Sequence, residues 1–213
     1  MSDEKQYGLK EAYGVETPDD NVDLYSKWAN SYDQTFAQDR GYNYPAHIAQ
    51  VLHNLSEIED SPILDVGAGT GLVAQEILAN GRCVIDAIDI SPEMLAQSMA
   101  KGIYRNYIQA DLSQQLALDD DIYGAVVSAG TFTHGHVGPQ ALRELLRIAK
   151  PNALFCLGVN ATAFDKYGFG SAFAALQAED LISPLKFEKT NYYRDAGDDN
   201  GDDIGFTAVF RKI

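Results

Sequence analysis

From about residue 44 onward, apolar and polar positions follow two alternating patterns, one typical of strands and the other of helices. Segments with apolar residues three and four positions apart predict amphipathic helices, the first at 44–58 and the next at 72–78. Short segments between the helices predict strands at 63–66, 84–90, 104–109, 122–127 and 153–159. The last of these is apolar throughout, as is typical of a strand that is buried on both faces. Strands that alternate with helices predict an α/β fold with a mainly parallel sheet.

Two more strands are predicted near the C-terminus, at 187–193 and 205–210. We expect them to pair as an antiparallel hairpin, which makes the fold a seven-stranded α/β sandwich with one antiparallel edge strand. The acidic loop between them, 195–203, contains five aspartates that do not follow the EF-hand pattern of calcium sites. We therefore expect this loop to be a solvated turn.

The most regular feature of the N-terminal region is aromatic. Tyr25, Trp28 and Tyr32 are spaced so that they share one face of a helix. Asp20 or Asn21 is suited to cap the start of that helix. The aromatic face either packs on the rest of the chain or forms a lid over a ligand, and the spacing alone leaves both open.

The first predicted strand ends in three glycines at alternate positions, Gly67, Gly69 and Gly71, and a helix follows at once. Glycine allows a positive φ and lets a flat ligand lie against the main chain. The free N–H groups of the following helix point into this turn. Such turns serve dinucleotide and S-adenosylmethionine (SAM) sites, and Leu72 stands where a dinucleotide fingerprint has its third glycine. A plain structural turn is the alternative.

The second predicted strand ends in an acid, Asp89, which lies 22 residues after Gly67. An acid at this place in a βαβ unit can accept hydrogen bonds from both hydroxyls of a ribose. Asp86 is a competing acid, but it lies in the middle of the strand. Ser91 and Pro92 then predict the start of another helix.

The loop after the fourth strand contains the polar residues Thr131, Thr133, His134 and His136. Ligands of open α/β sheets lie beyond the carboxyl ends of the strands, so this loop should face the reactants. Imidazole titrates near neutral pH, which makes His134 and His136 the candidate general bases. No third ligand stands at a suitable spacing from the two histidines, so we expect no metal site.

The chain has 213 residues, enough for one domain with an appendage, and we expect residues 1–40 to form a tail and helical lid on a domain at 41–213. A net charge of −15 argues against nucleic acid and anionic membranes as partners. Cys83 and Cys156 lie beside apolar runs and are expected to be reduced core residues. With no apolar run long enough for a membrane span or a signal core, we expect a cytoplasmic protein. The oligomeric state stays open.

Taken in order, these strand ends carry a resemblance that no single one carries. Asp65 and the glycines form the pattern Asp-x-Gly-x-Gly-x-Gly, and the strings DISPEML, ADL and WANSYD follow or precede it at the expected places. From about residue 22 to the end, the chain resembles the Rossmann-like class I SAM-dependent methyltransferases. The segment 12–20 and the loop 133–137 further resemble the Williams–Beuren-region methyltransferase-like group.

The resemblance implies that SAM is the cofactor and assigns a role to each part of the site. The tyrosine of Tyr-Asp would lie over the methionine end, with Asp33 as a helix-turn cap, and Ile90 would pack on the adenine. Asp111 would accept from the adenine amino group while the backbone of Leu112 contacts the ring. The cofactor contacts that it implies are Tyr25, Trp28, Tyr32, Asp65, Gly67, Ala68, Gly69, Gly71, Asp89, Ile90, Met94, Asp111, Leu112, Ser128 and Thr131.

The function that follows is methylation of a small-molecule acceptor at oxygen or nitrogen. The aromatic segment from Phe164 to Phe173 is either a wall of the acceptor site or part of a packing helix. Two other functions stay open at this point. One is an NAD-type oxidoreductase on a related fold, and the other is a non-catalytic module that binds SAM.

Overall fold

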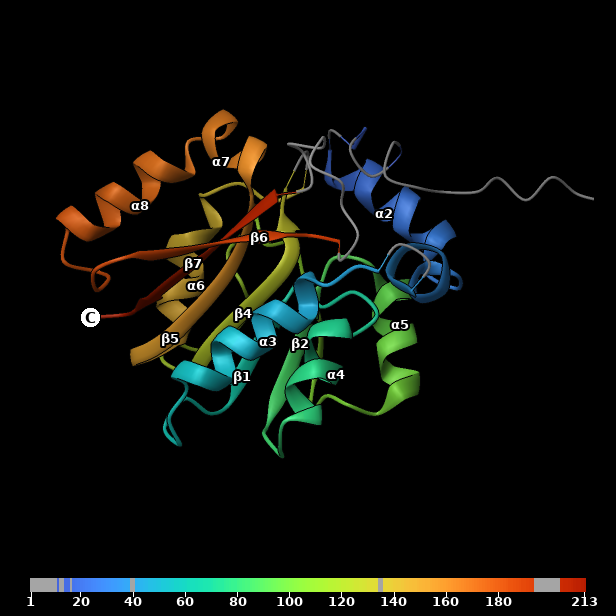
Figure 1. The fold of residues 1–213 in the computed structure, drawn as a ribbon, viewed down its shortest axis with the longest axis horizontal. Coiled ribbons are helices and arrows are strands. Elements are labelled where there is room, and N and C mark those ends of the chain that lie inside the picture. The colour runs from blue at the N-terminus through green and yellow to red at the C-terminus, as the bar shows by residue number, and fades with distance from the viewer. Residues whose placement is uncertain (1–10, 12–13, 16, 39–40, 134–135, 194–203) are drawn as a thin grey trace, which may run out of the picture.

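The structure is a computed structural model that describes residues 11, 14–15, 17–38, 41–133, 136–193 and 204–213. Its centre is a seven-stranded sheet in the order β3-β2-β1-β4-β5-β7-β6 (Figure 1). The strands are β1 (Ile63–Val66), β2 (Ile85–Asp89), β3 (Tyr107–Gln109), β4 (Tyr123–Phe132), β5 (Ala149–Asn160), β6 (Lys186–Asn191) and β7 (Ile204–Arg211). The first five are parallel to one another, so their carboxyl ends meet along one edge of the sheet.

Helices cover both faces of this sheet. In Figure 1, α3 and α4 lie in front of the strands and α6 lies behind them. The described helices are α2 (Pro18–Trp28), the π-helical segment η1 (Asp33–Gln38), α3 (Tyr44–Leu55), α4 (Leu72–Ala79), α5 (Pro92–Lys101), α6 (Ala141–Ile148), α7 (Ala161–Lys166) and α8 (Phe169–Ala178). The predicted seven-stranded α/β sandwich with an antiparallel C-terminal hairpin is confirmed.

Two apolar cores separate on the two faces of the sheet. Successive strand residues point to opposite faces, so Ile63 belongs to the core with α3 and α4, while Leu64 belongs to the core with α6 and α8. Val127 and Val126 of β4 divide in the same way. Both faces are therefore apolar, which explains the continuous apolar runs of the sequence. Both cysteines are free, and Cys156 is buried.

The antiparallel strand does not lie at the edge of the sheet, where we expected it. β7 runs antiparallel between β5 and β6, and β6 forms the edge. The burial of the two strands gives the reason. β7 is mostly buried, whereas the sequence of β6, KFEKTN, is almost wholly exposed. A polar, lysine-containing strand is suited to an edge because it discourages pairing with other chains.

The N-terminal helix begins earlier than predicted. Thr17 caps α2, its hydroxyl accepting from the Asp20 N–H while the Asp20 carboxylate accepts from the Thr17 N–H. This capping box, with Pro18 at the first helical position, replaces the predicted cap at Asp20 or Asn21. α2 lies beside α5 at one end of the molecule (Figure 1). The division of the chain at residue 40 stays a prediction.

The C-terminal aromatic segment packs on the sheet and does not line a ligand site. Phe169 and Phe173 are buried against the core with α6, and Phe164 stacks on both. The rings of Phe187 and Phe206 from β6 and β7 complete this cluster. Of the two interpretations of this segment, the described contacts therefore support the packing helix. None of the described helices is long and apolar enough to cross a membrane.

Candidate cofactor site

A cavity of about 900 Å³, counting its open mouth, lies at the carboxyl ends of β1, β2, β3 and β4. It collects many of the predicted contacts from segments that are far apart in the sequence. Those that line it are Tyr25, Tyr32, Gly67, Ala68, Gly69, Asp89, Ile90, Met94, Asp111, Leu112, Thr131 and His136.

The glycine turn forms the floor of this cavity, and two of its glycines have different reasons to be glycine. Gly67 has φ +65°, and a Cβ there would lie 2.0 Å from the Thr131 hydroxyl oxygen. Gly69 has φ +53°, and the nearest heavy atom to its hypothetical Cβ is the Gly67 carbonyl oxygen at 4.0 Å. The lack of a side chain at Gly67 therefore leaves room for Thr131 of β4. The lack of one at Gly69 leaves the main chain open to a ligand.

Gly71 and Ser128 do not line the cavity. A Cβ at Gly71 would lie 2.6 Å from Ile103, so the lack of a side chain here leaves room for the segment after α5. Ser128 is fully buried, and its hydroxyl donates to the Val66 carbonyl oxygen at 2.8 Å. Thr131 donates to the same oxygen at 2.8 Å, but it also faces the cavity.

Asp65 is buried beneath the turn and also does not line the cavity. Its Oδ2 accepts from the Tyr104 hydroxyl at 2.6 Å, and its Oδ1 has no hydrogen-bond partner. Burial raises the pKa of the Asp65 carboxyl to about 7, against the opposing effect of the Tyr104 hydrogen bond. Asp65 is therefore a buried support of the turn whose carboxyl is protonated below about pH 7.

The two acids of β2 have different surroundings, and only Asp89 lines the cavity. Asp86 accepts from Arg105 at 2.7 and 2.9 Å and also from Asn106 and Tyr123. Burial opposes ionisation there, but these hydrogen bonds outweigh it and lower the pKa of Asp86. Asp89 lines the cavity instead and accepts the N–H of Gly69 at 2.8 Å and of Ser91 at 2.9 Å.

These two backbone hydrogen bonds fix the Asp89 carboxylate while leaving lone pairs on both oxygens. Burial raises the pKa of Asp89, and the backbone N–H groups oppose that rise. The residues beside it, Ile90 and Met94, and the end of β3 at Ala110, Asp111 and Leu112 line the same part of the cavity. This part combines a fixed acid with apolar walls and a second acid, as the predicted ribose and adenine contacts require.

Three tyrosines, Tyr25, Tyr32 and Tyr42, line the cavity from the N-terminal region. Burial raises the pKa of Tyr32 well above its usual value, so its hydroxyl stays neutral. Trp28 does not line the cavity. Its ring is buried behind Tyr25 and Tyr32, and its Nε1 donates to Thr35 at 3.0 Å. α2 ends at Trp28, so Tyr32 lies beyond it and the three aromatic residues do not share one face of α2 as predicted. Tyr25 and Tyr32 face the cavity, whereas Trp28 packs in the core.

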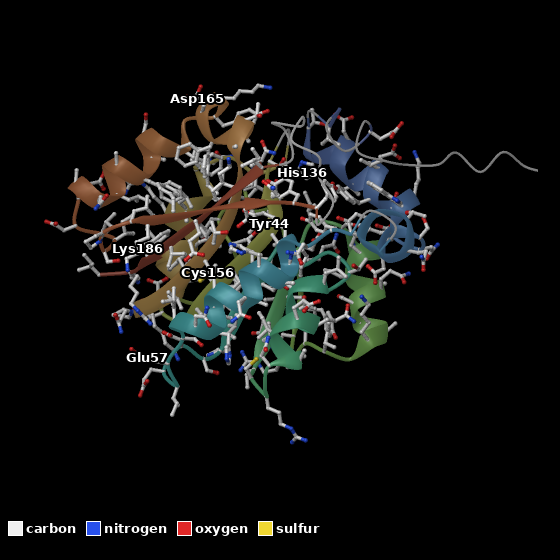
Figure 2. All side chains as sticks on the ribbon, viewed as in Figure 1. Tyr44, Glu57, His136, Cys156, Asp165 and Lys186 are labelled. Atoms are coloured by element: carbon white, nitrogen blue, oxygen red, sulfur yellow. The ribbon has the colours of Figure 1, made fainter. Side chains whose placement is uncertain are left out.

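His136 connects the loop after β4 to this aromatic region. Its Nε2 lies 3.2 Å from the Tyr25 hydroxyl oxygen, and the two rings meet edge to face with centroids 5.7 Å apart. Figure 2 shows His136 at the end of the sheet that α2 covers. His134, the other candidate base, lies outside the described residues.

A family model of a methyltransferase domain matches residues 64–157, which include the glycine turn, Asp89, Asp111 and His136. Methyltransferase-like protein 27 of Homo sapiens is 33% identical to this chain over 152 residues, which are 70% of this chain and 61% of that protein. By these matches and by its fold, the chain is related to the class I SAM-dependent methyltransferases. The cofactor of this family is SAM, as the strand-end residues predicted, and the NAD alternative is not supported.

Two further comparisons give the extent of the similarity in sequence and in fold. The ubiquinone biosynthesis O-methyltransferase of Rickettsia prowazekii is 28% identical over 126 residues, which are 58% of this chain and 49% of that protein. The chain thus spans between half and about three fifths of the length of these two curated relatives. A solved structure of a cyclase named SpnF has a TM-score of 0.68 at 14% identity, over 93% of this chain and 97% of that chain, which is a likeness of fold alone.

The cavity fits SAM on three observations besides the motifs. The open approach to Gly69 leaves room for a ligand against the main chain, and Asp89 has acceptor capacity facing that room. In addition, the tyrosine rings offer the faces that attract a cation such as a sulfonium. Asp89, the glycine turn and the end of β3 would hold the nucleoside, and Tyr32 would lie at the methionine end.

The structure also adds lining residues that the sequence did not single out for the site: Tyr42, Pro45, Thr70, Leu72, Val73, Ala110, Ala129, Gly130 and Val137. Several of these, such as Leu72 and Val73, directly follow the glycine turn. The prediction that the start of this helix faces the site could have found them. Tyr42 had no local signal. It reaches the cavity because it forms a β-bridge with Tyr193 and its hydroxyl approaches Gly130. Both contacts join segments that are distant in sequence.

Proposed function

We propose that this protein transfers the methyl group of SAM to an oxygen or nitrogen atom of a small molecule. One observation carries the proposal. A single cavity joins the nucleoside-binding residues around Asp89 to a second region lined by Tyr25, Tyr42 and His136. The first region serves the cofactor, and the second offers an acceptor a place beside it.

In this proposal the bound SAM supplies a reactive methyl group on sulfur, and the protein contributes binding and alignment. Asp89 and the glycine turn fix the nucleoside, and the tyrosines exclude water from the methionine end. Holding two reactants in line can lower a barrier by roughly 7–11 kcal/mol at best. Positioning can therefore supply much of the rate enhancement before any proton is moved.

His136 is the proposed general base of the described residues. A phenol or a protonated amine must lose a proton when it accepts a methyl group, and a neutral imidazole can take it. The Tyr25 hydroxyl beside Nε2 orients the ring toward the cavity. His134 shares this proposed role on sequence grounds alone.

The charge of the cavity supports a neutral or cationic acceptor. Among its described lining residues, Asp89 and Asp111 carry acidic groups and none is a lysine or arginine. The chain as a whole has a net charge of −15. An anionic acceptor, including a nucleic acid, would be repelled by this field. The same field disfavours an anionic membrane surface as a partner. We propose, from the two free cysteines, that the protein acts on metabolites in the cytoplasm.

The relatives support methyl transfer without naming the acceptor. The Rickettsia prowazekii relative is named for O-methylation in ubiquinone biosynthesis, which is consistent with an oxygen acceptor here. The fold itself also serves a protein named as a cyclase. For that reason a non-methylating role of the SAM site stays the second candidate, and activity has to be measured directly.

The test is an assay with SAM carrying an isotopic label on the methyl group. The purified protein is incubated with pooled small metabolites, with tRNA and with DNA fragments in separate reactions. We expect label in the metabolite pool alone. Label in tRNA or DNA would contradict the proposed acceptor class, and no transfer to any pool despite SAM binding would favour the non-catalytic role.

A further inference from the structure

The Asp33 carboxylate joins the N-terminal segment to the cofactor site. Its Oδ1 accepts from the Thr70 hydroxyl at 2.5 Å, and its Oδ2 accepts from Lys101 Nζ at 2.6 Å. Lys101 also donates to Gln75 of α4 at 2.8 Å. Asp33 was predicted only as a cap of the helix turn, but it links η1 to the glycine turn and to α5.

This link continues into the residues that would hold the ribose. Thr70 is nearly fully buried and follows Gly69 directly, and the Gly69 N–H donates to Asp89. On the other side, Asp33 follows Tyr32, which lines the methionine end of the cavity. A continuous series of hydrogen-bonded or adjacent residues therefore runs from the ribose acid to Tyr32.

A second contact fixes the turn just before Tyr32. Gln97 Nε2 of α5 donates to Asn30 Oδ1 at 2.9 Å. Because Gln97 and Lys101 are one helical turn apart on α5, both hold the same stretch of the N-terminal segment. The segment is thus attached to the core at two points that flank Tyr32.

The environment of the Asp33–Lys101 pair favours a real contribution to binding. The exposed fractions of the two side chains are 34% and 23%, so water screens the pair only in part. The chain contains a matched pair for comparison, Asp23–Lys27 within α2, with a distance of 2.5 Å but exposed fractions of 67% and 49%. That pair connects no two elements, and such exposed pairs contribute little.

We propose that Asp33 is a positioning residue that couples cofactor binding to closure of the N-terminal segment, with Thr70 and Lys101 as its partners. When Thr70 and Lys101 hold Asp33, Tyr32 is kept over the methionine end of the cofactor. In return, bound cofactor orders the glycine turn and so stabilises the closed conformation of the N-terminal segment. The proposal rests on SAM binding in the proposed site and not on which acceptor is methylated.

The experiment uses the full chain and three near-isosteric variants, Asp33→Asn, Thr70→Val and Lys101→Met, with Lys27→Met as the matched control. Calorimetry measures SAM affinity, and hydrogen exchange of residues 22–36 is followed with and without SAM. We expect Asp33→Asn to weaken SAM binding about tenfold, the low end for loss of a hydrogen bond to a charged group. Thr70→Val and Lys101→Met should each weaken it less, about threefold, because each variant keeps one of the two contacts of Asp33. Lys27→Met should bind SAM like the wild type.

The combined variant Asp33→Asn/Thr70→Val should lose less affinity than the product of the single losses, because both changes remove the same interaction. The SAM-dependent slowing of exchange in residues 22–36 should shrink in Asp33→Asn. The variant with the two charges exchanged, Asp33→Lys/Lys101→Asp, should bind SAM more tightly than Asp33→Asn, though less tightly than the wild type. Melting of each variant without SAM checks folding, and a variant that melts like the wild type but binds SAM weakly shows positioning rather than a folding defect.

Wild-type affinity in Asp33→Asn, with unchanged protection of residues 22–36, would overturn the proposal. If Asp33→Asn does not fold, the same readouts in Thr70→Val and Lys101→Met decide it, and wild-type behaviour in both would overturn it. If the wild-type protein itself does not bind SAM, the cofactor site fails and the coupling with it. If the wild type binds SAM and the variants bind it equally well, the proposed coupling is refuted while the proposed cofactor site stands.

Discussion

Two regions of this molecule are rich in aromatic residues, and only one of them faces the cavity. The tyrosines of the N-terminal region line it, whereas Phe164, Phe169 and Phe173 pack on the face of the sheet covered by α6 and α8. In the sequence the two sets look alike. Each places several aromatic residues near a candidate site, and each could be a wall or a packing surface.

The difference follows from where each segment meets the sheet and from the hydroxyl group that tyrosine has and phenylalanine lacks. The N-terminal segment crosses the carboxyl ends of the strands, where ligands of open sheets bind. Tyrosine combines an apolar ring with a polar hydroxyl, which suits a partly wet cavity, and phenylalanine suits a dry core. Trp28 lies in the N-terminal region but packs in a dry core as the phenylalanines do, because its indole N–H donates to Thr35.

The largest expected effect comes from the phenylalanine region. Phe173→Ala should lower the free energy of unfolding by about 3–5 kcal/mol, because Phe173 is buried in the core between α8 and the sheet. The matched control is Phe187→Ala in the same cluster, whose ring is 44% exposed and should cost much less. Chemical denaturation measures both, and SAM affinity of the folded protein should be unchanged. Weakened SAM binding in stable Phe173→Ala would return this region to the ligand site.

The next effect tests the chemistry at the tyrosine end. His136→Ala should lower methyl transfer about a hundredfold, the low end for general acid–base catalysis, while SAM affinity stays near the wild-type value. His53→Ala, on the exposed part of α3, is the control and should retain full activity. Full turnover in His136→Ala would reduce the role of this loop to positioning.

A smaller effect separates the two regions by pH. Phenylalanine rings do not titrate, but the buried Asp65 carboxyl below the glycine turn has a pKa raised by burial to about 7, against a usual value of 3.8. Between these values the unfolded chain has lost a proton that the folded chain retains. The free energy of unfolding therefore falls as pH rises through this window, by at most about 1.4 kcal/mol per pH unit.

Asp65→Asn removes this dependence because the amide does not titrate. We expect the variant to gain stability relative to the wild type between pH 5 and 7, and the gain should level off above pH 7. Urea unfolding at several pH values measures the difference between the two proteins. Parallel pH profiles for variant and wild type would contradict the raised pKa of Asp65.

The smallest effect asks whether Tyr32 contacts the sulfonium. Tyr32→Leu should weaken SAM binding by about 0.5–1 kcal/mol through loss of the cation–π contact. The demethylated product has no positive sulfur, so its affinity should change less. Tyr32→Phe keeps the ring and is the control for both ligands. Equal losses for SAM and product in Tyr32→Leu would assign Tyr32 to packing alone.

The parts of this account that the sequence predicted rest on local patterns. The apolar runs predicted the strands, and the strand-end positions of Gly69, Asp89 and Asp111 predicted one cavity because parallel strands end along a common edge. Glycine spacing further separated this turn from a dinucleotide fingerprint. In each case the sequence signal lies within a few residues of the structural feature.

The parts that it missed depend on contacts between distant segments. Asp65 and Gly71 belong to the glycine motif, yet Tyr104 and Ile103 turn one into a buried support and the other into a packing contact. Tyr42 reaches the cavity through Tyr193, and Asp33 reaches Thr70 and Lys101 across the fold. A helical face likewise cannot tell Trp28 from Tyr25 until its surroundings are known.

Calorimetry of SAM binding to the wild type and to Asp89→Ala tests the central claim most directly, that the cavity at the strand ends is a SAM site held by Asp89. The control is Asp165→Ala, which removes one charge from α7, away from the cavity (Figure 2). Hydrogen bonds to a charged group contribute about 1.5–3 kcal/mol each, so Asp89→Ala should lose at least about tenfold in affinity. The wild type and Asp165→Ala should bind SAM alike. Equal binding by the wild type and Asp89→Ala would contradict the claim.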